Sequence, residues 1–212
     1  VGSSAPLIQD SVSLALLDSS DMSQQYFIEY AGTTDVQLTG YINRRSVAAV
    51  VDAFSSDADR TALVLDSPGG ILSDAFRLAD FIVENGLIVG ITNSCVSACV
   101  LLLAASPNST ASSNAELIFH RPVERADFSS LQAQESMLEA TLEYYDRFDQ
   151  YGVPTASIER FKENEFTPIS LGEAYESGII DSIWEEAANI FHDPSELCKR
   201  VDCFQVPVVI SD

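Results

Sequence analysis

The sequence has little positive charge, few histidines and cysteines, and no long apolar run. Lys and Arg number 11 against 32 Asp and Glu, which gives a formal net charge of −21 over 212 residues. A surface this acidic disfavours the phosphates of nucleic acids and anionic membrane surfaces. The longest apolar run, residues 98–105, is far shorter than the roughly 20 residues that span a bilayer. We therefore expect neither a nucleic-acid partner nor a membrane span.

Four cysteines and two histidines are a small stock of metal ligands. The cysteines form two local pairs, Cys95 with Cys99 and Cys198 with Cys203, and neither has the C-x-x-C spacing common in structural zinc sites. Cys198 and Cys203 form either a small disulfide loop or two reduced thiols. Cys95 and Cys99 are interpreted as small buried residues, and the sequence leaves open whether a disulfide joins them. We expect no metal and no cofactor. The even count favours an extracytoplasmic location, periplasmic or secreted, and leaves a cytoplasmic one open.

Hydrophobic residues make up 46 % of the chain, enough for one domain with a buried core. Periodicity predicts strands at 25–30, 34–40, 61–65, 87–91, 115–120 and 179–184. It predicts helices at 46–54, 73–85, 97–105, 128–151, 155–163 and 170–177. We expect Ser46 to be the N-cap of the first helix and residues 93–96 to form a turn. The alternation of strands and helices indicates right-handed crossovers and a largely parallel sheet.

Three predicted strand ends carry residues that acyl-transfer chemistry needs. Ser97 begins an apolar helix, where the helix dipole and free N–H groups stabilise developing negative charge. Gly69 and Gly70 form a turn in which no Cβ blocks a substrate from a backbone donor. His120 ends another strand and can act as a general base. Because sites in parallel sheets form at the carboxyl ends of strands, these residues are expected to meet.

In this combination the sequence resembles the Clp protease proteolytic subunit, within the wider ClpP/crotonase superfamily. The resemblance covers roughly residues 26–184. It is carried by VQLTGYI (36–42), LVLDSPGGILSDAFRLADFI (63–82), SCVSACVLLLAAS (94–106), NAELIFHRPV (114–123) and ISLGEAYESGIIDSI (169–183). The Cys-x-Ser-Ala-Cys form around Ser97 looks nearer to secreted or periplasmic relatives.

The resemblance implies an α/β fold of repeated ββα units with a mostly parallel sheet and a helical handle. It also implies a serine endopeptidase for peptide or protein substrates, with Ser97 as nucleophile and His120 as general base. The N–H groups of Gly70 and Ala98 would form the oxyanion hole.

The implied organisation is an N-terminal arm (1–25), a peptidase domain (26–192) and a C-terminal tail (193–212). The handle, residues about 124–163, would join subunits into a homo-oligomer. The sequence leaves open whether an ATPase partner exists.

The third member of the triad is where the sequence departs from the family pattern. An alignment without a gap puts Phe166 there, which cannot orient a histidine. A two-residue insertion at 167–168 puts Asn164 there instead, and we prefer Asn164, with Glu165 next.

Three alternatives to this serine peptidase are kept. They are an inactive scaffold or ring subunit of the same fold, a Ser–Lys dyad through Lys162, and an acyl-CoA enzyme of the crotonase type. The last would need a basic patch for the CoA phosphates, and the sequence shows none.

Overall fold

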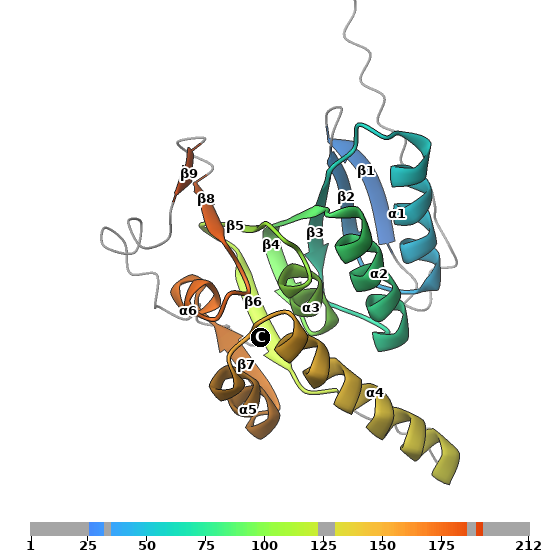
Figure 1. The fold of residues 1–212 in the computed structure, drawn as a ribbon. Coiled ribbons are helices and arrows are strands. Elements are labelled where there is room, and N and C mark those ends of the chain that lie inside the picture. The colour runs from blue at the N-terminus through green and yellow to red at the C-terminus, as the bar shows by residue number, and fades with distance from the viewer. Residues whose placement is uncertain (1–25, 32–34, 123–129, 186–189, 193–212) are drawn as a thin grey trace, which may run out of the picture.

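The computed structural model describes residues 26–31, 35–122, 130–185 and 190–192. Within these ranges, nine strands form one sheet and six helices pack around it, which confirms the predicted α/β class (Figure 1). The strands are β1 (Tyr26–Ala31), β2 (Asp35–Gly40), β3 (Ala62–Ser67), β4 (Ile88–Val96), β5 (Ser109–Ser112), β6 (Glu116–His120), β7 (Phe166–Ile169), β8 (Ser182–Glu185) and β9 (Ile190–His192). The helices are α1 (Arg44–Ser56), α2 (Leu72–Asn85), α3 (Ala98–Ala104), α4 (Leu131–Gln150), α5 (Thr155–Glu163) and α6 (Leu171–Glu176). The predicted arm and tail, with Cys198 and Cys203, lie outside the described residues.

The sheet branches at β4 because that strand pairs with two neighbours in turn. Residues 89–91 pair in parallel with β5, and residues 94–96 pair in parallel with β6. The main path runs β1-β2-β3-β4-β5-β8-β9, and β6 and β7 lie off it. The pairing is antiparallel only for β1, β7 and β9 among the described strands. The branch places the carboxyl ends of β4 and β6 side by side.

Helix α3 lies at the centre of the core. All seven of its residues are buried, as its unbroken apolar sequence requires. Helix α2 packs against α3 and also against α1, so these helices cover one side of the sheet (Figure 1). Each fully buried leucine of α3, such as Leu101 or Leu102, stabilises the fold by about 1.5–3 kcal/mol. The element that follows the candidate nucleophile is therefore firmly anchored.

Several local expectations were wrong. The N-cap of α1 is Asn43 rather than Ser46, which is the third residue of a capping box: each side chain accepts from the other's backbone N–H. Residues 93–96 form the end of β4 instead of a turn. The short strands β5, β7 and β9 were not predicted, and the expected strand at 179–184 begins only at Ser182.

Helix α4 projects from the body of the molecule (Figure 1). The end nearer the body is anchored by Tyr144, Tyr145 and Phe148, which are buried. The apolar side chains of its outer part are exposed: Leu131 by 79 %, Leu138 by 60 % and Leu142 by 56 %. The apolar positions of this one helix thus divide into an anchored part and an unpartnered part.

Candidate active site

Ser97 occupies a strained turn between β4 and α3. Its φ is 60° and its ψ is −126°, and it is the one non-glycine residue with positive φ in the described part of the chain. Such a conformation costs on the order of 1–3 kcal/mol and persists only where the surroundings enforce it. The residue is 9 % exposed, so it lies just below the surface. A strained serine at the end of a parallel strand indicates a functional constraint.

Hydrogen bonds hold the Ser97 backbone from two sides. Its N–H donates to the carbonyl of Ile118 on β6 at 2.9 Å. Its carbonyl accepts from the hydroxyl of Tyr144 on α4 at 3.1 Å and from the Val100 N–H at 3.0 Å. Burial raises the pKa of Tyr144 well above its usual range, with a smaller contribution from Tyr145, so the hydroxyl keeps its proton.

A disulfide links the two segments that flank Ser97. Cys95 near the end of β4 is bonded to Cys99 in the first turn of α3, with a Cα–Cα distance of 5.3 Å. Both residues have no exposed surface. The expectation that both residues are buried is confirmed, and the structure contains the bridge that the sequence left open.

Gly69 and Gly70 pack directly against neighbouring backbone. Gly69 has a φ of 90°, and a Cβ there would lie 2.6 Å from the Val96 carbonyl oxygen and 2.7 Å from Ser97 Cβ. A Cβ on Gly70 would lie 2.0 Å from the carbonyl oxygen of Ile42. Both positions therefore require glycine, and the turn lies immediately beside Ser97.

The Gly70 amide is directed away from the strand it pairs with. In the parallel bridge between Ile42 and Gly70, the hydrogen bonds are made by Ile42 with Gly69 and Ile71, at 2.9 and 2.8 Å. In parallel pairing, the residue opposite Ile42 points its own N–H to the other side. The Ala98 N–H is the first of α3 and has no acceptor within the helix. Both predicted oxyanion-hole donors are thus available to a ligand.

His120 is the last residue of β6, the strand next to β4, and Ser97 follows directly after β4. In that pairing Val96 lies opposite Ile118, and His120 follows two residues later. Its Nδ1 lies 2.8 Å from the carbonyl oxygen of Arg121. Because a carbonyl can only accept, the proton of the neutral imidazole is on Nδ1, and Nε2 has a free lone pair. A backbone carbonyl thus fixes the tautomer that a general base needs.

Phe166 is the residue opposite His120. The antiparallel pairing of β6 with β7 runs from Leu117–Ile169 to His120–Phe166 without a shift, so residues 167 and 168 form no bulge. The ring centroids of His120 and Phe166 are 5.4 Å apart. Asn164 ends α5, where its amide donates to the Arg160 carbonyl at 2.9 Å. Roles for Asn164 and for the exposed Glu165 next to it remain predictions.

An aromatic cluster connects the helices to the site. Phe119, the residue before His120, is fully buried and stacks on Phe161 of α5 at 4.2 Å between ring centroids. Tyr144 and Phe148 of α4 lie 5.6 and 5.8 Å from the same ring. The position of β6, and so of His120, is therefore coupled to both helices.

Lys162, the candidate for a Ser–Lys dyad, lies on α5 and forms an ion pair with Glu159 of the same helix, with 2.8 Å between Nζ and Oε1.

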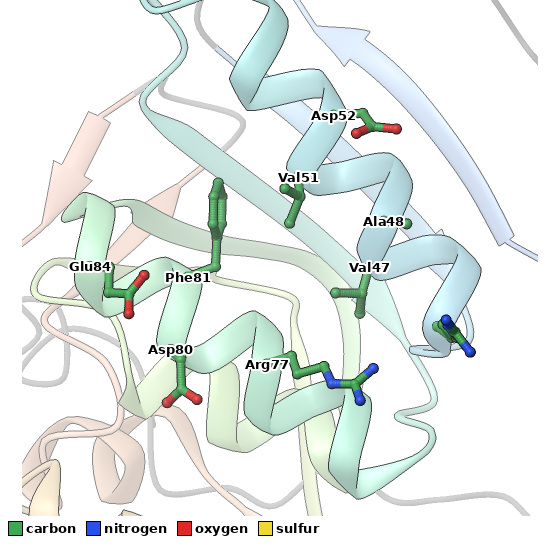
Figure 2. A pocket seen from close by; sticks show the side chains of 9 residues that line it. Val47, Ala48, Val51, Asp52, Arg77, Asp80, Phe81 and Glu84 are labelled. Atoms are coloured by element: carbon green, nitrogen blue, oxygen red, sulfur yellow. The ribbon is translucent and has the colours of Figure 1, made fainter.

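A cavity of about 500 Å³ lies elsewhere, between α1 and α2. Figure 2 shows Val47 and Val51 of α1 and Phe81 and Arg77 of α2 lining it. None of its lining residues belongs to the predicted catalytic set. The cavity is a separate feature of the helical layer, and its lining contains no serine, cysteine or histidine.

The family model of the Clp protease matches residues 32–187. This is most of the chain, so the protein belongs to the Clp protease family, a family of serine peptidases. No curated protein matches the chain closely enough to be named beside it. Among the described residues, no helix is both long enough and apolar enough to cross a membrane.

Sequence reasoning did not identify three contributors to the site. The disulfide had a sequence signal, since two cysteines flank Ser97 symmetrically. The Tyr144 hydroxyl had none, because it lies 47 residues away from its acceptor in sequence. The Arg121 contact had none either, because any residue provides a backbone carbonyl.

Proposed function

We propose that the protein is a serine endopeptidase that cleaves peptide bonds through an acyl-enzyme on Ser97. The observation that carries the proposal is the strained Ser97 turn, packed against Gly69, with His120 at the end of the adjacent strand. A strained backbone of this kind is typical of functional sites. The family membership supports the reaction class.

In the acylation step, a substrate carbonyl oxygen accepts hydrogen bonds from the Gly70 and Ala98 amides. Ser97 Oγ attacks the carbonyl carbon and its proton passes to His120 Nε2. The negative charge of the tetrahedral intermediate is stabilised by the two amides and by the start of α3. His120 then protonates the leaving amine, and the acyl group remains on Ser97.

In the deacylation step, His120 removes a proton from water, and the water oxygen attacks the acyl carbon. The bond from that carbon to Ser97 Oγ then breaks, His120 returns the proton to Oγ, and the acid product leaves. The Arg121 carbonyl keeps the His120 tautomer, but it offers no full negative charge to the imidazolium. We therefore expect slower turnover than a triad with a carboxylate gives.

Active-site labelling tests the proposal directly. The intact mass of the parent is measured after incubation with a fluorophosphonate and compared with Ser97→Ala and His120→Ala. We expect one adduct in the parent, none in Ser97→Ala and strongly reduced labelling in His120→Ala. A parent that remains folded and unlabelled would contradict the proposal.

An inactive scaffold or ring subunit is the second candidate function. The observation that favours it is Phe166, which occupies the position opposite His120 where a carboxylate would assist the base. In that case Ser97 and His120 would be remnants without turnover. Cleavage of a casein digest by the parent and not by Ser97→Ala would exclude this candidate.

We also propose that α4 mediates a homo-oligomer. Its outer part exposes Leu131, Leu138 and Leu142, and apolar side chains grouped on a projecting helix favour burial against another surface. The double variant Leu138→Glu/Leu142→Glu is expected to lower the mass in multi-angle light scattering. Val83→Glu, at an exposed valine of α2, is the matched control and should keep the parent mass. Equal masses for parent and double variant would contradict this role.

An extracytoplasmic location is proposed as well. The Cys95–Cys99 disulfide supports it, because such bonds persist in oxidising compartments. Cells are quenched in acid and the protein is then unfolded and alkylated, so that buried thiols react as well; we expect Cys95 and Cys99 to remain unmodified. Their full alkylation would place the protein in a reducing compartment.

A further inference from the structure

The disulfide spans the nucleophile symmetrically. Cys95 lies two residues before Ser97 and Cys99 two residues after it, so the bond connects the end of β4 to the start of α3 across the turn. No step of the proposed peptidase chemistry uses a sulfur atom. The disulfide must therefore have a role other than direct participation in the chemistry.

Global stability is a weak reason for this bond. In the chain-entropy account, the stabilisation from a disulfide grows with the length of the loop that it closes. Here the two cysteines are only four residues apart in sequence. The effect of so short a loop is mainly local: it limits how the strand end and the helix start can move relative to each other.

The turn inside that loop is the strained element of the site. Ser97 has a positive φ, which surrounding contacts must enforce. The hydrogen bonds from Tyr144 and to Ile118 hold only the carbonyl and the N–H of Ser97 itself. The disulfide joins the two flanking segments covalently to each other.

A small movement of the turn would alter the reaction geometry. Ser97 Cβ lies so close to Gly69 that a Cβ on that glycine would be 2.7 Å away. The next residue, Gly70, carries one of the two proposed oxyanion donors. Relaxation of the Ser97 backbone would shift Oγ relative to that amide, and a misplacement of about 1 Å can cost about 100-fold in rate.

We propose that Cys95 and Cys99 are positioning residues whose disulfide holds Ser97 in its reactive conformation, so that reduction by a dithiol inactivates the site reversibly. The inference rests on the proposed peptidase function. In the reduction, a thiolate of the dithiol attacks one sulfur and the S–S bond breaks. The second thiol of the reagent then closes a ring disulfide, and two electrons and two protons end on Cys95 and Cys99. Since both cysteines are buried, exchange requires local opening.

The test uses the full chain carrying Cys198→Ser/Cys203→Ser, which removes the other thiols. This protein is labelled with a fluorophosphonate before reduction, after reduction with dithiothreitol and removal of the reagent, and after reoxidation. A second protein also carries Cys95→Ala/Cys99→Ala. The limiting labelling rate and the half-saturating probe concentration are measured separately, and circular dichroism verifies that each sample is folded.

We expect reduction to lower the limiting rate about 10- to 100-fold, with the half-saturating concentration unchanged. Reoxidation should restore the rate. The Cys95→Ala/Cys99→Ala protein should be slow throughout and insensitive to dithiothreitol. A bond that served only stability would lower the melting temperature and leave the rate of the folded protein unchanged, and that result would overturn the inference.

Amide hydrogen exchange gives a readout that does not depend on activity. Reduction should speed exchange in residues 94–100 at least tenfold more than in β3, which serves as the internal control. Equal protection of residues 94–100 in both redox states would overturn the inference, even if labelling fails in every sample. Absence of labelling in the oxidised protein would contradict the proposed function instead, so the two failures are distinguishable.

Discussion

The two halves of the candidate site differ in how tightly they are held. Ser97 is buried, strained, cross-linked by a disulfide on both flanks and in contact with a glycine that admits no side chain. His120 is partly exposed, and its neighbours are a backbone carbonyl and Phe166, which is 61 % exposed. The Ser97 half is therefore held at its backbone by several contacts. In the His120 half, the strand is held by β4 and β7, but the imidazole itself has one hydrogen bond in the described part of the chain.

This difference indicates that the fold keeps a conformation at Ser97 that lowers its stability. Strain and close packing at Ser97 are retained although a relaxed turn would be more stable, and that favours a selected geometry. In the proposed mechanism, His120 can accept a proton without a carboxylate neighbour, because the Arg121 carbonyl fixes its tautomer. If the proposed function holds, we expect the geometry at Ser97 to contribute more to the rate than the orientation of His120.

The largest expected effect comes from disturbing the nucleophile half with Gly69→Ala. The new Cβ would meet the Val96 carbonyl oxygen at 2.6 Å and Ser97 Cβ at 2.7 Å, at a φ of 90°. The turn must shift, and we expect the labelling rate to fall about 100-fold.

Gly86→Ala is the matched control. Gly86 also has positive φ, 61°, but nothing lies within 4 Å of the added Cβ. It should cost about 1–2 kcal/mol of stability from the left-handed backbone and leave labelling unchanged. Equal labelling of the two variants would contradict the tight packing of the nucleophile half.

The base half should respond in the opposite direction to Phe166→Asp. A carboxylate opposite His120 would stabilise the imidazolium that forms during acylation. Because the position is exposed, the pair is worth at most about 1 kcal/mol, or about a fivefold higher rate of peptide hydrolysis. Phe166→Asn, which adds polarity without charge, should give no increase. A fall in rate with Asp would show that the aromatic ring itself matters.

A smaller effect is expected from Tyr144→Phe. Tyr144 of α4 contacts both halves of the candidate site, because its hydroxyl binds the Ser97 carbonyl and its ring stacks on Phe119 next to His120. The variant removes one hydrogen bond to the Ser97 carbonyl, while the bond from Val100 remains. We expect a loss of about 1 kcal/mol in the free energy of unfolding, measured with urea. No loss at neutral pH would mean that this hydroxyl does not hold the turn.

The same variant has a distinct signature in alkali. Because burial raises the pKa of Tyr144 in the folded protein, unfolding above pH 10 releases its proton. The parent should therefore lose stability with rising pH more steeply than Tyr144→Phe, by up to about 1.4 kcal/mol per pH unit. Below pH 10 the two slopes should be the same.

The smallest effect is expected from Asn164→Ala. Its amide donates to the Arg160 carbonyl, while the Nδ1 of His120 faces the Arg121 carbonyl. We expect less than a twofold change in labelling, and the same for Glu165→Ala. A tenfold loss in either variant would restore the third triad member that the sequence suggested.

The main sheet and helices were predictable because each buried strand and amphipathic helix has its own period. The strands that were missed are three or four residues long, too short for a period, and β7 contains a proline. Ser97, His120 and the two glycines were proposed as site residues from residue type and order, and the structure brings Ser97 and Gly69 into contact. The strain at Ser97 and the contact of His120 with the Arg121 carbonyl depend on backbone geometry, which residue type does not encode.

The most direct test of the central claim is a crystal structure of the protein after reaction with a fluorophosphonate. The account predicts phosphorus bonded to Ser97 Oγ, with the phosphonyl oxygen within hydrogen-bond distance of both the Gly70 and Ala98 amides. It also predicts that His120 Nε2 faces the adduct while Nδ1 remains on the Arg121 carbonyl. An adduct on another residue, or a phosphonyl oxygen that points away from both amides, would contradict it.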